Sequence, residues 1–161
     1  MSLEAYKIGL SEQYQGEVIG EVAINCLLQR FDSPWQQYLL GTALQLETET
    51  KARLRPVVAQ LDISIIESEE SREAGMALSN VIAGMDWQAA MRLLAQAIEP
   101  YVEKYDAIAQ SAPPDFRELA DSMFEHERLI CRLWEYEARG EGESVVEEIA
   151  SQLAFPLPKP A

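Results

Sequence analysis

Apolar residues recur along the chain at steps of three and four, the spacing that places them on one face of a helix. The first such run predicts a helix over about residues 11–31, which an earlier turn over residues 4–9 can precede. A second run extends to Leu61. Ser33 can cap its start, and Pro34 suits the first helical position. No stretch alternates between apolar and polar residues as a strand would, so we expect an all-α protein.

The same spacing predicts the remaining elements. These are a short helix ending near Gly84, a long helix capped by Asp86 and reaching about Ile108, a long helix opened by Pro114 or Asp115 and ending at Gly140 or Gly142, and a short helix over about residues 144–153. Pro56 is expected to kink its helix or to end the regular part, and Pro100 is expected to kink the long helix that contains it. We interpret residues 1–154 as one domain and residues 155–161 as a proline-rich tail that cannot be helical.

Composition and charge exclude several classes of partner. The chain has 161 residues, 48% of them hydrophobic, which suffices for one ordinary core. Its net charge of -14 argues against nucleic acid and against an anionic membrane surface, because both require clustered Lys and Arg. No apolar run approaches the roughly 20 residues that span a bilayer, and the start of the chain lacks the pattern of a signal peptide. Cys26 and Cys131 are expected to be reduced core thiols, and the protein to be cytoplasmic.

Three stretches carry a resemblance to a known superfamily: "YQGEVIGEVAINCL", "LQLETETKARLRP" and "FEHERLICRLWEYEARGEGES". They resemble, in order and spacing, the helices of ferritin-like, rubrerythrin-related bacterial proteins. The resemblance implies a four-helix bundle, a crossover helix between the second and third bundle helices, and a short C-terminal helix. It also implies a metal site, for which this chain offers the candidate ligands Glu17, Glu21, Glu47, His126 and Glu127.

The ligand set of a ferritin-like di-iron centre is incomplete in this sequence. Such a centre takes one glutamate from each of two helices and a Glu-x-x-His pair from each of the other two. Thr50 stands three residues after Glu47, where the pair would need histidine, and Met123 stands three before His126, where it would need glutamate. The acids of the third long helix fall on its polar side. We therefore expect no complete di-iron centre, and either Glu17 or Glu21 remains open as the inner acid of the first helix.

Two interpretations of the interior acids follow. In the first, Glu17, Glu21, Glu47, His126 and Glu127 form a reduced site for one ion, and the resemblance implies iron or manganese. In the second, the same residues pair with one another and with basic side chains, for which the candidates are Lys51, Arg53 and Arg128. Ion pairing alone would satisfy the physics, because a buried charge must be paired or neutralised.

The two interpretations lead to two classes of function. The first, which the sequence slightly favours, is a non-catalytic ferritin-like protein that acts by self-association or by binding a partner, with a homodimer as the expected form. The second is a metal-binding ferritin-like oxidase, peroxidase or iron-handling protein. The sequence alone establishes no cofactor, no substrate and no enzymatic activity.

Overall fold

The computed structural model describes residues 1–160, and within them the chain forms six α-helices, one 3₁₀ turn and no strand. The prediction of an all-α protein is confirmed. The elements are α1 (Leu3–Leu28), α2 (Pro34–Gln60), α3 (Glu69–Ile82), α4 (Trp87–Ser111), the turn η1 (Pro114–Phe116), α5 (Arg117–Glu137) and α6 (Glu143–Gln152).

Side-chain caps define where most of the helices begin. Ser33 accepts a hydrogen bond from the Gln36 backbone and the Gln36 side chain accepts one in return, which is a complete capping box. Asp86 caps α4 as predicted. The first helix begins well before residue 11, because Ser2 caps it by accepting a hydrogen bond from the Ala5 amide.

Neither internal proline ends its helix, and whether either bends it stays a prediction. Pro56 lies inside α2, which continues to Gln60, and Pro100 lies near the middle of α4. The described part of the tail, residues 155–160, is non-helical, as expected, and residue 161 lies outside the described residues. Its start is held to α2, because the Glu49 carboxylate accepts hydrogen bonds from the backbone amides of Ala154 and Phe155.

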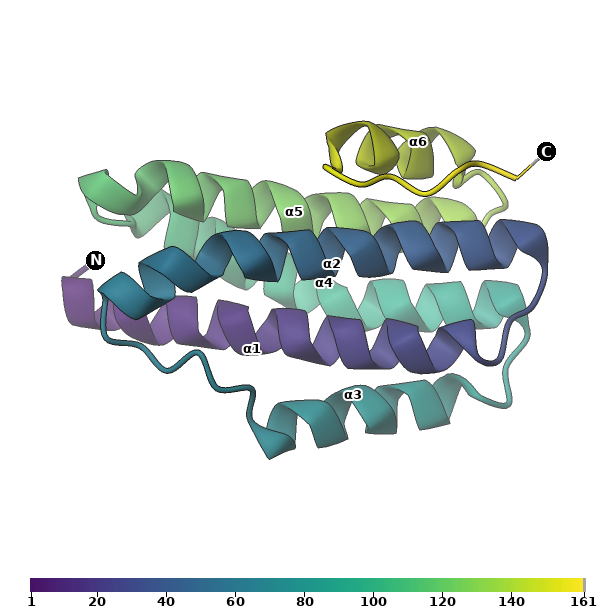
Figure 1. Cartoon of the computed structure of the whole chain (residues 1–161), viewed down its shortest axis with the longest axis horizontal. Coiled ribbons are helices and arrows are strands. Elements are labelled where there is room, and N and C mark those ends of the chain that lie inside the picture. Colours follow the sequence, from purple (N-terminus) through teal and green to yellow (C-terminus); the bar gives the residue numbers. More distant parts are fainter. Residues whose placement is uncertain (161) are drawn as a thin grey trace.

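The four long helices run along one another, as Figure 1 shows, with α1 packed against α2 and α4 packed against α5. The chain passes from α2 to α4 through α3, which lies on the outside of α1. Gly75 of α3 allows this close packing: a Cβ at that position would lie 2.7 Å from the backbone oxygen of Ile19. The short helix α6 covers the other side, where it contacts α2 and α5.

The core consists of two apolar clusters with a polar layer between them. One cluster contains Tyr6 to Tyr14 of α1 and the end of α2, and the other contains Ile24 and Leu27 of α1 and the start of α2. α4 and α5 likewise change from one cluster to the other along their length. Buried polar side chains lie where the two clusters meet, among them Glu17, Glu47, Thr50, His126 and Glu127. Three of the four long helices, α1, α2 and α5, thus present polar residues at one level of the bundle.

Candidate metal centre

Three side chains from three helices meet in the polar layer: Glu17 of α1, Glu47 of α2 and His126 of α5. His126 Nε2 lies 3.3 Å from Glu17 Oε2 and 3.5 Å from Glu47 Oε2. Two atoms bound to one ion at about 2.1 Å, with an angle of about 90–110° between the bonds, are about 3.0–3.4 Å apart. The separations in the structure therefore fit three ligands of a single ion.

Two of these ligand atoms have no hydrogen-bond partner. Glu17 Oε2 and His126 Nε2 are enclosed by protein, and no group among residues 1–160 satisfies either of them. A buried polar atom left unpaired typically costs about 1–3 kcal/mol. A cation bound between the two atoms would satisfy both, so the donor set fits a metal ion.

The other ring nitrogen of His126 is oriented by α2. His126 Nδ1 lies 3.1 Å from Thr50 Oγ1, which also accepts a hydrogen bond from Arg53 at 3.2 Å. If Nδ1 carries the ring proton and donates it to Thr50, Nε2 is left with a free lone pair directed at the two glutamates. Thr50, which stands where a ferritin-like site would have histidine, thus supports the imidazole instead of binding an ion.

The surroundings of the acids oppose their charge. Burial and the neighbouring Glu47 carboxylate raise the pKa of Glu17 well above its usual value. Burial raises the pKa of Glu127 to about 7, with the adjacent His126 acting in the opposite direction. Each of these shifts means that a bare carboxylate is disfavoured here and that a cation would be favourable.

Glycines on α1 make the room that the cluster needs. A Cβ at Gly20 would lie 2.8 Å from the carboxyl carbon of Glu47, and one at Gly16 would lie 2.7 Å from the hydroxyl of Tyr105. The side chains of α2 and α4 can therefore approach α1 closely at this level only because both positions lack a side chain.

A cavity of about 250 Å³ lies beside the cluster, between α1, α3, α4 and α5. Its walls are mainly apolar, and Glu17, Glu47 and Glu127 are the acidic residues that line it. His126 does not line it. The two carboxylates that face the imidazole thus also border an open space.

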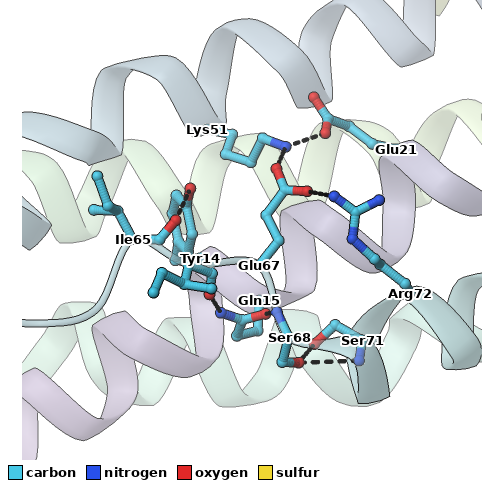
Figure 2. Close-up of polar contacts among 10 residues, drawn as sticks. Tyr14, Gln15, Glu21, Lys51, Ile65, Glu67, Ser68, Ser71 and Arg72 are labelled. Carbon is cyan, nitrogen blue, oxygen red and sulfur yellow. Dashed lines mark hydrogen bonds and ion pairs between the residues drawn. The ribbon is translucent and has the colours of Figure 1, made fainter.

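Glu21 belongs to a different group of charges, shown in Figure 2. Its carboxylate is bonded to Lys51 of α2, which also binds Glu67 in the segment before α3, and Glu67 in turn binds Arg72. We call these four residues the ion-pair network. Glu17 is therefore the inner acid of α1 and Glu21 the outer one, with side-chain exposures of 1% and 19%.

The basic side chains considered as partners of the interior acids do not reach them. Lys51 is taken up by the ion-pair network, Arg128 pairs with Glu125 on the surface, and Arg53 donates to Thr50 and Ser122. Pairing with a lysine occurs only for Glu21, whereas Glu17 and Glu47 have the His126 ring and each other as their ionisable neighbours.

The fourth long helix adds no ligand. On α4, Glu99 and Glu103 are exposed and Asp106 accepts a hydrogen bond from Gln110. Met123, at the position of the missing glutamate on α5, is buried in an apolar cluster. Within the described chain, the cluster thus offers ligands for one ion and lacks those that would bridge a second.

Some residues of the site were not predicted. The spacing on the helices located Glu17, Glu47 and His126, but it gave no role to Thr50, Gly20 or Tyr105. The pair Gly16 and Gly20, one turn apart on the same helix, is the sequence signal that could have indicated a close approach at this level.

A search of protein-family models, of curated proteins and of solved structures found no match to the chain. None of the helices within residues 1–160 combines the length and the apolar character needed to cross a bilayer.

Proposed function

We propose that the protein binds one divalent metal ion, iron or manganese, through Glu17, Glu47 and His126. The observation that carries this proposal is the pair of buried atoms without a hydrogen-bond partner, Glu17 Oε2 and His126 Nε2, which lie 3.3 Å apart with Glu47 Oε2 3.5 Å from the same ring nitrogen. Two carboxylates and one neutral imidazole neutralise a divalent ion, whereas without one the layer holds buried acids that no lysine or arginine pairs.

The donor types narrow the choice of ion. Imidazole suits iron and zinc, and carboxylates suit manganese and other hard ions, so a mixed set of two carboxylates and one imidazole favours iron or manganese over calcium. When bound, such an ion supplies Lewis-acid or redox chemistry at the edge of the cavity. The contribution of the chain is to hold the imidazole through Thr50, to exclude water with the two apolar clusters, and to leave one side of the carboxylates open.

The arrangement of the helices supports a ferritin-like fold for this site. The pairs α1/α2 and α4/α5, the passage from α2 to α4 through an outer helix, and inward acids on α1 and α2 are the features expected from the resemblance. In this proposal the protein is a member of that superfamily with a site reduced to one ion.

The proposal is tested by metal analysis. The protein is expressed with added Fe²⁺ or Mn²⁺, passed through gel filtration, and analysed for metal by mass spectrometry. We expect about one ion per chain. Adding the ion at 100 times its dissociation constant should raise the free energy of unfolding by about 2.7 kcal/mol.

Single variants show whether metal binding depends on the three proposed ligands or on helical acids in general. Glu47→Gln and His126→Ala should lose the ion and remain folded by circular dichroism, whereas Glu21→Gln, one turn from Glu17 but outside the cluster, should keep it. A folded wild-type protein that retains no iron or manganese, or one that retains two ions per chain, would contradict the proposal.

Self-association, which the sequence slightly favoured, is independent of the site. The same gel filtration reports it: elution as a homodimer would agree with the sequence-based expectation, and elution as a monomer would contradict it.

A further inference from the structure

The cavity beside the metal ligands is large enough for a small molecule. An engineered protein cavity of about 150 Å³ binds benzene, which has six carbon atoms. At that ratio a cavity of about 250 Å³ holds roughly ten non-hydrogen atoms. Space of this kind weakens a core unless something occupies it, because each missing contact reduces the dispersion energy.

The walls of the cavity indicate an apolar body for the occupant. They are formed by aliphatic and aromatic side chains, among them Ile24, Leu78, Leu94, Ile98, Tyr105 and Trp134. Trp134 and Tyr105 are almost completely buried, so the deep part of the cavity has an aromatic wall. At the other extreme Tyr101 is 42% exposed and Ala74 is exposed, which places the opening between α3 and α4.

One polar group on the wall has no partner. Glu127 lines the cavity and is 92% buried, and no hydrogen bond or ion pair reaches its carboxyl group from the described residues. Glu17 and Glu47 are accounted for by the proposed ion, so Glu127 is the acid that remains. None of the residues that line the cavity is a lysine or an arginine.

We infer that the cavity binds a small apolar primary amine, with its hydrocarbon body against the aromatic wall and its ammonium group on Glu127 beside the metal ligands. This inference rests on the proposed function. Only if an ion neutralises Glu17 and Glu47 is Glu127 the one acid of the lining left to bind an ammonium group. A ligand carboxylate would be repelled by the acidic lining, and a neutral alcohol would leave the charge of Glu127 unpaired.

Three probes that differ only in the polar group test the inference. The metal-loaded protein is titrated at pH 7 with 2-phenylethylamine, 2-phenylethanol and phenylacetate by isothermal calorimetry. We expect the amine to bind at least tenfold more tightly than the alcohol, and phenylacetate to bind most weakly. In Glu127→Gln, this preference for the amine should fall below about threefold, while the affinity for the alcohol stays the same.

A variant that fills the cavity tests the location. Ala97→Phe should weaken amine binding at least tenfold with the metal content unchanged, whereas Ala107→Phe, at an exposed position of α4 outside the lining, should bind as the wild type does. If Ala97→Phe does not fold, Ala74→Phe at the exposed opening replaces it.

The outcomes distinguish the two proposals. A protein that holds its ion but binds no probe, or binds phenylacetate as tightly as the amine, or is unaffected by the filling variant, overturns the inference and leaves the metal site standing. A protein without metal overturns the proposed function at the analysis step, before any probe is added.

Discussion

Glu17 and Glu21 lie one helical turn apart on α1, yet their carboxylates have opposite surroundings. Glu21 is half-buried at the surface and is bonded to Lys51, within a network in which acidic and basic side chains alternate. Glu17 is 1% exposed and faces Glu47 and His126, with no lysine or arginine in reach. The same residue type thus forms an ordinary ion pair in one place and an unneutralised acid in the other.

The pKa directions express the same contrast. Hydrogen bonding to Lys51 lowers the pKa of Glu67 in the network, whereas burial raises the pKa of Glu17 and Glu127 in the polar layer. Charge stabilises the protein in the first region and destabilises it in the second. Binding of an ion in the polar layer should therefore raise the free energy of unfolding.

The largest change in the free energy of unfolding should come from replacing Glu127, an acid of the polar layer. The pKa of Glu127 lies at about 7 in the folded chain and near 4.3 in an unfolded one. A raised carboxyl pKa means that stability is fully present below the unfolded pKa and is lost as the pH rises through the folded pKa. In chelator-treated protein, Glu127→Gln should match the wild type at pH 4 and exceed its free energy of unfolding by about 3 kcal/mol at pH 8. Urea unfolding at both pH values measures this, and a difference independent of pH would contradict it.

Removing a charge from the ion-pair network should lower the free energy of unfolding, which is the opposite of the effect expected for Glu127→Gln. Lys51→Met leaves Glu21 and Glu67 facing each other without the ammonium group that joins them, which is 96% buried. We expect a loss of about 2 kcal/mol at pH 7, below the 3–5 kcal/mol for a fully buried pair because both carboxylates touch water. The loss should shrink towards pH 4 as the acids become protonated.

An exposed pair supplies the control for this variant. Lys7 and Glu4 are 3.6 Å apart on the surface, and Lys7→Met should change the free energy of unfolding by less than about 0.5 kcal/mol. Equal effects of the two substitutions in urea unfolding would remove the distinction between the network and a routine surface pair.

A smaller change sharpens the contrast without altering any charge. In Gly20→Ala the new Cβ would meet the carboxyl group of Glu47 at 2.8 Å, and this flexible end of the side chain must move away. We expect unchanged or slightly increased helix stability, because alanine is favoured over glycine in a helix, together with a roughly tenfold loss of metal affinity. Gly84→Ala, where no atom lies within 4 Å, should leave both unchanged in metal titrations followed by thermal unfolding.

The comparison also shows how far sequence could go. Helical spacing identified Glu17, Glu47 and His126 as inward residues, since the period of the helix alone decides which side a residue faces. It could not separate Glu17 from Glu21, because a step of four turns the side chain by only about 40° and both fit the same apolar stripe.

Which of Glu17 and Glu21 is the inner acid depends on tertiary structure, which helical spacing does not contain. Lys51 reaches Glu21 because Glu67, in the loop before α3, holds its ammonium group from the other side. The conformation of that loop and the shift of α2 along α1 are tertiary properties. The cavity was invisible for the same reason, since it lies between helices that are distant in the chain.

The way α3 is attached has a consequence for the rate at which a ligand could reach the cavity. The buried residues of α3 are Ser71, Gly75, Ser79 and Ile82, and Leu78 adds a partly buried apolar side chain. The two ends of the helix are held by polar bonds, from Lys51 to Glu67 and from Arg30 to the Ser79 carbonyl. Because few apolar contacts are lost when such a helix detaches, its amides should exchange with deuterium faster than those of the four long helices. Opening of this helix would then be the step that limits both uptake and escape of a bound molecule.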